Sequence, residues 1–209
     1  MDKIVVIGGG GHAKVVICIL RKLGYVIDWY TDNHDRGTIL GVPRLGGDSS
    51  LSGLIERNQC SAAVVGIGKI DTSDTRLSLQ RRYTKLGFAF PVICSPHAVV
   101  NEGVTIRAGA VVLDGAIVNS GTTIGEACIL NTGSIVEHDC EIGSNVHIAS
   151  GVTLSGGVSI GDNCTIGTGA SIIQSIKVCE GCLIGAGSTV VEDISVAGTY
   201  VGSPARKIR

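Results

Sequence analysis

The sequence of 209 residues carries 17 Lys and Arg against 18 Asp and Glu, which gives a formal net charge of −1 at pH 7. This balance shows no excess charge of the kind that draws proteins to nucleic acids or anionic membranes. The longest apolar runs, residues 15–20 and 88–94, are too short to span a bilayer. The N-terminus enters a strand without a signal-peptide pattern, so we expect a cytoplasmic protein of one or two domains.

The first 95 residues alternate between short apolar segments and helical patterns. We predict strands over 3–7, 26–30, 62–66 and 88–93, helices over 13–23 and 73–86, and a short helix over 48–58 capped by Asp48, Ser49 and Ser50. Strands that alternate with helices indicate a small parallel sheet, so residues 1–95 are predicted to form a Rossmann-like α/β domain.

A glycine-rich turn joins the first strand to the first helix. The spacing of Gly8, Gly10 and Ala13 fits a dinucleotide-binding fingerprint, and Asp32 lies at a suitable distance to meet a ribose. The domain, however, has about half the length of a full dinucleotide fold. Backbone N–H groups at the start of a helix suit any phosphate. We therefore favour a nucleotide diphosphate over NAD, with a purely structural turn as the remaining alternative.

From residue 100 to residue 195 an aliphatic residue recurs at every sixth position without a change of phase, from Val100 through Val190. Glycine dominates three residues after each aliphatic position, where Asn and Asp fill most other cases, and a small residue usually follows. These residues tolerate tight turns and positive φ. The repeat predicts a parallel β-helix with three short sides in each 18-residue coil, because an α-helix requires apolar spacings of three and four.

Four of the eight cysteines, Cys128, Cys140, Cys164 and Cys182, occupy the small inward position of the repeat, where a thiol fills space. Cys179 and Cys182 form a C-x-x-C pattern. The hexad phase places Cys179 outward and Cys182 inward, so we expect the two side chains to diverge and to form neither a metal site nor a redox pair. Free thiols fit a reducing compartment.

Several motifs occur together in this chain. They are Gly10-Gly11-His12, Asp32-Asn33, the segment 131–140 with its Glu-His-Asp-Cys end, and the closing Gly202-Ser203-Pro204-Ala205. With them the whole chain resembles the bacterial hexapeptide-repeat sugar acetyltransferases, which include sialic acid O-acetyltransferases and N-acetyltransferases of nucleotide-linked 4-amino sugars. The resemblance implies a left-handed β-helix acetyltransferase domain over 96–209, acetyl-CoA as the donor, no metal, and a homotrimer.

The resemblance also implies roles for individual residues. His138 corresponds to the general base and Asp139 to the carboxylate that raises its basicity. His147, Gly156, Thr168 and Ala186 correspond to contacts with acetyl-CoA, and Gly10, Gly11, His12, Asp32, Asn33 and Gly68 line the nucleotide end of the acceptor. These residue types suit acetyl transfer. An imidazole accepts a proton near neutral pH, and backbone N–H donors stabilise an oxyanion.

The spacing of two histidines carries a further expectation. His138 and His147 are nine residues apart, which is half of an 18-residue coil, so they face different sides of one column. A site that uses both must lie between neighbouring subunits.

We therefore expect an acetyl-CoA-dependent N-acetyltransferase that acts on a nucleotide-linked amino sugar, on a 4-amino group, for surface glycan synthesis. O-acetylation of a sialic or related nonulosonic acid is the alternative within the same family. A non-catalytic hexad-repeat scaffold or binding protein, and an NAD-binding regulator, are the alternatives from other classes.

Overall fold

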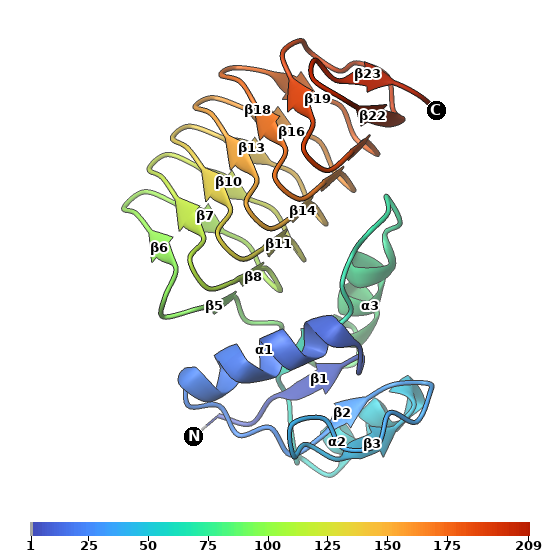
Figure 1. Ribbon diagram of the computed structural model, residues 1–209. Coiled ribbons are helices and arrows are strands. Elements are labelled where there is room, and N and C mark those ends of the chain that lie inside the picture. Colours follow the sequence, from blue (N-terminus) through green and yellow to red (C-terminus); the bar gives the residue numbers. More distant parts are fainter. Residues whose placement is uncertain (1) are drawn as a thin grey trace.

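The computed structural model describes residues 2–209 and shows an α/β region followed by a long column of short parallel strands (Figure 1). The α/β region holds a parallel four-stranded sheet in the order β3-β2-β1-β4. Its strands are β1 (Val5–Ile7), β2 (Tyr30–Thr31), β3 (Arg44–Gly46) and β4 (Ala63–Val65). Its helical segments are α1 (Gly11–Lys22), the 3-10 helix η1 (Asp48–Leu51), α2 (Ser52–Glu56) and α3 (Thr75–Thr84).

Apolar residues hold the helices of this region to its sheet. In α1, Ala13, Val16, Ile17 and Leu20 are buried at spacings of three and four, and they pack with Val6 of β1. Basic Arg21 and Lys22 fall in the last turn of α1, where they complement the helix dipole. The predicted strand–helix alternation is thus confirmed, with the helices beginning and ending within a few residues of their expected bounds.

Three details of the predicted α/β region are wrong. The second strand is β2 at Tyr30–Thr31 rather than residues 26–30, with Val26 held to Lys3 by a single bridge. Strand β3 was not predicted, since its Arg-Leu-Gly sequence has no apolar periodicity. No side chain caps the segment that begins at Asp48. Its carboxylate instead accepts a hydrogen bond from the Thr31 hydroxyl at 2.8 Å.

The segment 88–93, predicted to be the last strand of the α/β domain, also differs. Ala89 makes only an isolated bridge to Ala62, and the chain then forms β5 (Ile93–Cys94), which pairs with β8 of the column. The reason is packing: Phe88 and Phe90 lie in the core beneath the sheet, whereas Ile93 packs against Val111 and Leu113 of the column.

The column has three faces, each a parallel sheet, except that the β14 face ends in the antiparallel pair of β22 and β23. The β14 face consists of β5, β8 (Val111–Val112), β11 (Ile129–Leu130), β14 (His147–Ile148), β17 (Thr165–Ile166), β20 (Leu183–Ile184), β22 (Thr199–Val201) and β23 (Arg206–Lys207). The β12 face consists of β6 (Val99–Val100), β9 (Ile117–Val118), β12 (Ile135–Val136), β15 (Thr153–Leu154), β18 (Ser171–Ile172) and β21 (Thr189–Val190). The β13 face consists of β7 (Thr105–Ile106), β10 (Thr123–Ile124), β13 (Glu141–Ile142), β16 (Ser159–Ile160) and β19 (Lys177–Val178).

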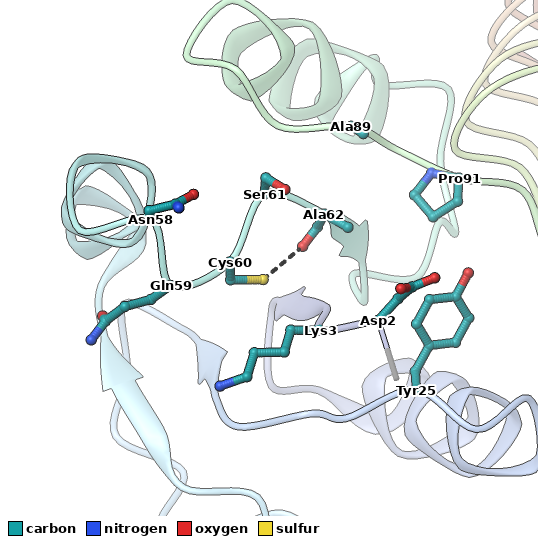
Figure 2. A pocket seen from close by; sticks show the side chains of 10 residues that line it. All are labelled: Asp2, Lys3, Tyr25, Asn58, Gln59, Cys60, Ser61, Ala62, Ala89 and Pro91. Carbon is teal, nitrogen blue, oxygen red and sulfur yellow. Dashed lines mark hydrogen bonds between the residues drawn. The ribbon is translucent and has the colours of Figure 1, made fainter.

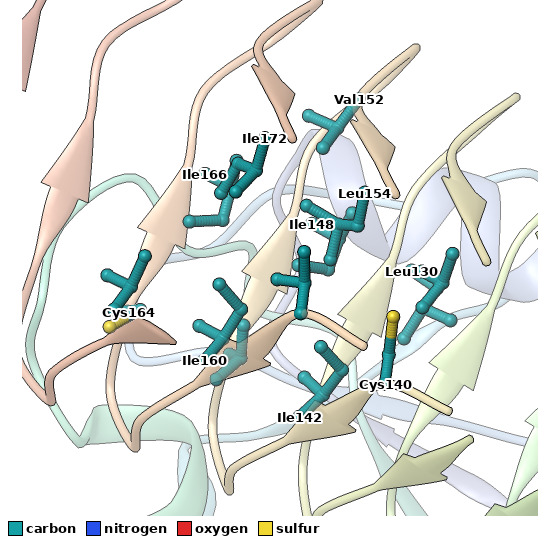
Figure 3. Packing of buried hydrophobic residues seen from close by; sticks show 14 of the residues in the cluster. Leu130, Cys140, Ile142, Ile148, Val152, Leu154, Ile160, Cys164, Ile166 and Ile172 are labelled. Carbon is teal, nitrogen blue, oxygen red and sulfur yellow. The ribbon is translucent and has the colours of Figure 1, made fainter. Parts of the chain in front are cut away.

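Each strand pairs with the strand 18 residues further on, as Ile142 pairs with Ile124 and with Ile160. The aliphatic series from Val112 onward and the small residues that follow the corners point into the column and form one continuous core (Figure 3). In the first coil Ile106 is only partly buried and Val100 is 38% exposed. Most corners turn through a glycine with positive φ, and Asp139, Asn145 and Asn163 adopt the same conformation. The predicted fold class, a Rossmann-like α/β region followed by a parallel β-helix of hexapeptide repeats, is confirmed.

The prediction that Cys179 and Cys182 diverge is wrong. Their sulfur atoms lie 3.6 Å apart, and Cys179 packs partly buried against the core of the column. The two residues flank the tight turn at 180–181, which brings the ends of a four-residue segment together. Both thiols remain free.

Across residues 2–209, no helix combines the length and the apolar character that crossing a bilayer requires.

Candidate active site

His138 lies in the corner that connects the β12 face to the β13 face, here called the β12–β13 corner. Its side chain is 65% exposed, and its Nδ1 lies 2.8 Å from Oδ2 of Asp139. Asp139 occupies the left-handed corner position, with φ of 58°, which directs its carboxylate back toward the imidazole. With Nδ1 paired to a carboxylate, the lone pair for accepting a proton is on Nε2. The predicted pairing of an outward imidazole with its neighbouring carboxylate is present.

Gly156 occupies the same corner one coil further along, 18 residues after His138. A Cβ atom at Gly156 would lie 2.6 Å from Nε2 of His138. The absence of a side chain at this position therefore leaves open the space beside the nitrogen that accepts the proton. The structure thus brings together three of the predicted site residues, His138, Asp139 and Gly156.

Thr168 and Ala186 lie elsewhere on the column. They follow β17 and β20 in the corner that connects the β14 face to the β12 face, and both are exposed. They stack on each other, 18 residues apart, as His138 and Gly156 do. Within one chain the predicted acetyl-CoA contacts therefore occupy two different corners of the column.

His147 lies on the β14 face, with both ring nitrogens hydrogen-bonded. Its Nδ1 is 2.5 Å from the carbonyl oxygen of Lys69, and its Nε2 is 3.1 Å from Nδ2 of Asn131. Burial lowers the pKa of His147 to about 4, although the carbonyl of Lys69 opposes the shift. The structure therefore separates His147 from His138 and packs it against the loop that follows β4.

A cavity of about 390 Å³ opens at the glycine turn between β1 and α1. Gly9, Gly10 and Gly11 line it, and so do the side chains of Lys14 and Arg36. A Cβ at Gly10 or Gly11 would meet no atom within 4 Å, so the backbone here is open to a ligand. Backbone N–H groups at a helix start, flanked by two cations, favour an anionic group such as a diphosphate.

Sequence reasoning missed Lys14 and Arg36. Lys14 could have been predicted from the sequence, because it follows Gly10 and Gly11 by one helical turn and so lies on the same side of the helix start. Arg36 follows Asp32 by four residues, and the two side chains pair at 3.5 Å.

Asp32 closes one side of the glycine turn. Its carboxylate accepts hydrogen bonds from the backbone N–H of Gly9 at 2.9 Å and of His34 at 2.8 Å. Burial acts to raise the pKa of Asp32, but these two N–H groups and Arg36 hold it below its ordinary value. Neighbouring Asn33 is exposed and lies close to Gly47. In the part of the chain that the structure describes, the sheet has four strands, which is too few for the two halves of a full dinucleotide fold.

His12 and Gly68 lie between the glycine turn and the column. A Cβ at Gly68 would be 3.5 Å from that of His12, and Nε2 of His12 is buried without a hydrogen-bond partner. Burial lowers the pKa of His12 to about 3, helped by the guanidinium of Arg76 and by His147. His12 is therefore a neutral imidazole at physiological pH, placed behind the glycine turn rather than in its open cavity.

A second cavity of about 400 Å³ lies at the opposite end of the sheet, near the amino ends of β1 and β4 (Figure 2). Its lining includes Lys3, whose ammonium pairs with Asp28, and Cys60, whose thiol donates to the carbonyl of Ala62. Ligands of open α/β sheets bind at the carboxyl ends of the strands, so this cavity is not part of the candidate site. Within residues 2–209, no three His, Cys, Asp or Glu side chains gather as a metal-ion site.

Comparison with known proteins identifies both regions of the chain. Residues 3–82 match the PglD N-terminal domain, and residues 121–156 and 157–192 each match the bacterial transferase hexapeptide of six repeats. A GDP-perosamine N-acetyltransferase from Caulobacter crescentus, solved with CoA and GDP-perosamine, is 35% identical, with a TM-score of 0.94 over 100% of this chain and 98% of its own.

The chain belongs to the PglD family of hexapeptide-repeat acetyltransferases. The acetyltransferase domain of PglB from Neisseria gonorrhoeae is also 35% identical, with a TM-score of 0.93 over 100% of both chains. WeeI from Acinetobacter baumannii is 25% identical, with a TM-score of 0.78 over 100% of both chains. Comparison with curated protein sequences gives no match. The predicted family and the predicted enzyme class, an acyltransferase, are confirmed.

Proposed function

We propose that this PglD-family enzyme transfers the acetyl group of acetyl-CoA to the amino group of a nucleotide-linked amino sugar, for surface glycan synthesis. The observation that carries the proposal is the His138–Asp139 pair held over Gly156, in a chain that matches a GDP-perosamine N-acetyltransferase over its full length. We place the reaction in the cytoplasm, where the free thiols of the chain would stay reduced.

The chemistry follows from the orientation of the imidazole. The amine nitrogen attacks the thioester carbonyl of acetyl-CoA, and Nε2 of His138 accepts the proton that the amine loses. The Nδ1–H of His138 donates to Asp139, 2.8 Å away, and this carboxylate stabilises the imidazolium. The tetrahedral intermediate then collapses to an amide, and the CoA thiolate leaves and takes up a proton. The bare backbone at Gly156 gives the acetyl group room beside Nε2.

We assign Gly156, Thr168 and Ala186 to the acetyl-CoA side, and not His147, because both of its ring nitrogens are hydrogen-bonded within the chain. The three assigned residues lie at two corners of a single column, so one copy alone does not gather them. A homotrimer with parallel columns would bring a β12–β13 corner of one subunit to the β14 face of the next. We propose that the active sites lie there, between subunits.

We assign Gly10, Gly11, His12, Asp32, Asn33 and Gly68 to the acceptor side, with Lys14 and Arg36 added from the structure. The open backbone and the two cations suit the diphosphate of a nucleotide sugar. This feature favours a nucleotide-linked acceptor over a free nonulosonic acid, which has no diphosphate.

The test is an acetyl-CoA assay over UDP-, dTDP- and GDP-linked 4-amino sugars and free sialic acids, with release of CoA thiol as the readout. We expect turnover on at least one nucleotide-linked amino sugar and none on sialic acid. Turnover on sialic acid alone would replace N-acetylation with O-acetylation. No turnover on any acceptor would contradict the proposal.

The location of the site is tested by mixing subunits. Trimers assembled from His138→Ala and Thr168→Trp chains would regain part of the activity if each site takes residues from two subunits, because some sites would then be intact. If both residues served a site within one chain, no mixed site would be intact, and activity would stay lost.

A further inference from the structure

The loop between β4 and α3 contains a segment here called the strap (residues 68–73). The strap lies along the column, and three side chains of the column hold it there. Asn145 Nδ2 donates to the carbonyl of Ser73 at 2.8 Å, and Thr165 Oγ1 donates to the carbonyl of Asp71 at 2.5 Å. His147 Nδ1 lies 2.5 Å from the carbonyl of Lys69. These anchors come from two successive coils, because Thr165 pairs with His147 across the β14 face.

Hydrogen bonds within the strap also join its first residues to its last. The Nζ of Lys69 donates to the carbonyl of Ser73 at 2.6 Å, and the carboxylate of Asp71 accepts from the N–H and hydroxyl of Ser73 at 3.0 and 2.7 Å. Lys69 is only 4% exposed, whereas its neighbour Ile70 is 87% exposed. A loop of six residues with this many internal bonds is held more firmly than an ordinary surface connection.

The neighbours of His147 determine which of its two ring nitrogens carries the hydrogen. Oδ1 of Asn131 accepts the N–H of Thr132 at 2.8 Å, so the Nδ2 group of Asn131 faces His147. Nε2 of His147 must then accept, and Nδ1 must carry the hydrogen that it donates to Lys69. Asn131 therefore fixes the tautomer in which His147 can hold the strap.

The two ends of the strap connect different parts of the enzyme. At one end Gly68 packs against His12, which follows the glycine turn. At the other end α3 begins and extends alongside the column (Figure 1). There Arg76, 2% exposed, donates through Nε to the carbonyl of Ala127 at 3.3 Å, and Gln80 donates to Ala108 at 3.1 Å. The strap and α3 thus run over four coils as one continuous contact.

We infer that Asn145, His147 and Thr165 are positioning residues, which hold the strap so that the acceptor side keeps a fixed place relative to the column. This inference rests on the proposed function for its kinetic consequence. A free strap would let Gly68 shift away from His12 and from the acceptor. Nothing in this role requires the three side chains to touch the acceptor.

Limited proteolysis with trypsin tests the strap without reference to activity. Trypsin cleaves after lysine, and Lys69 must leave its buried position before the bond to Ile70 can be cut. We expect Thr165→Val to raise the rate of cleavage after Lys69 by about fivefold, the effect of one lost hydrogen bond. Thr123→Val is the matched control: it is the same change at the same hexad position on the β13 face, and we expect the wild-type rate.

Two further variants distinguish the loss of an anchor from a folding defect. Thr165→Ser keeps the hydroxyl and should restore the wild-type rate. Asn145→Gly removes the bond to Ser73 at a corner where φ is 56°, which glycine adopts without strain, and should also raise cleavage. Unchanged cleavage after Lys69 in both Thr165→Val and Asn145→Gly would overturn the inference.

The kinetic readout separates positioning from general damage. Thr165→Val is expected to raise KM for the nucleotide sugar by about fivefold and to leave KM for acetyl-CoA within about twofold. Equal increases in both KM values, or a loss of kcat alone, would contradict a role on the acceptor side. If no amino sugar is acetylated by the wild type, the proposed function fails, and the cleavage experiment still decides whether the strap is held as described.

Discussion

His138 and Gly156 face each other across one coil of the column, and a single added methyl group at Gly156 would lie 2.6 Å from Nε2 of His138. This relationship follows directly from the repeat. Residues 18 apart stack at the same corner, so a glycine at one coil leaves space for the functional side chain of the coil before it.

Gly156→Ala is therefore predicted to lower kcat by about 100-fold, because the new methyl group displaces the imidazole from its reacting position. Gly156 does not have positive φ, so alanine fits its backbone and the melting temperature should change little. The measurement is kcat together with thermal unfolding. The matched control is Gly53→Ala in α2, where a Cβ meets nothing closer than 3.9 Å. Wild-type kcat in Gly156→Ala would show that the acetyl group is transferred elsewhere.

Asp139→Asn tests the partner of the imidazole. Asparagine tolerates the left-handed corner, with φ of 58°, so the fold should persist while the negative charge is lost. We expect a fall in kcat of about 10- to 100-fold, less than the loss on removing the base itself. Asp139→Ala would add backbone strain and lower the melting temperature, which Asp139→Asn should not. An unaltered kcat in Asp139→Asn would remove the carboxylate from the mechanism.

Two adjacent glycines at the turn are predicted to respond in different ways. A Cβ at Gly9 would lie 2.6 Å from the ring of Tyr30, so Gly9→Ala should cost about 1–3 kcal/mol of stability. Gly10 faces open space, so Gly10→Ala should keep the wild-type melting temperature and raise KM for the nucleotide sugar by about tenfold. Urea unfolding and steady-state kinetics measure the two effects. A normal KM in Gly10→Ala would place the acceptor away from this turn.

Two partly buried histidines make stability depend on pH. The pKa of His12 is lowered to about 3 and that of His147 to about 4, whereas an unfolded chain takes up these protons near pH 6.5. Below pH 6.5 the unfolded state binds more protons, so the free energy of unfolding falls as pH falls toward 4. Each histidine contributes up to about 2 kcal/mol of this loss at pH 5.

Urea unfolding from pH 7.5 to pH 5 measures the loss. His147→Gln should make the decline shallower, whatever its effect at pH 7.5. His34→Gln, at an exposed position, should leave the slope unchanged. A wild-type slope in His147→Gln would show that this imidazole becomes protonated in the folded state.

The column was predictable because each six-residue repeat needs the same three kinds of residue at the same positions. An inward aliphatic, a corner residue that tolerates positive φ and a small inward residue recur in phase from Val100 onward, and from Val112 onward the aliphatic residues are buried as expected. Val100, in the first coil, is exposed instead. The outward position of His138 followed from the same phase. Its pairing with Asp139 needed only the corner conformation that the repeat imposes.

The contacts that join distant segments were not predictable in this way. The strap is held by Asn145 and Thr165, whose residue types are ordinary at corners and on strands, and nothing in the local sequence marks their partners. Cys179 occupies a formally outward position, yet the turn at 180–181 brings its sulfur to Cys182. Strand β5 pairs with β8 of the column rather than with the α/β sheet. This pairing could not be predicted because it depends on contacts of Ile93 that form only in the assembled fold.

The most direct test of the account compares wild type and His138→Asn on the best acceptor of the nucleotide-sugar panel. Asparagine keeps a polar side chain at the corner and cannot accept the proton. We predict a fall in kcat of about 100- to 10,000-fold with unchanged melting temperature and unchanged binding of CoA by calorimetry. A His138→Asn enzyme that acetylates the amino sugar at the wild-type rate would contradict the central claim that this imidazole is the general base.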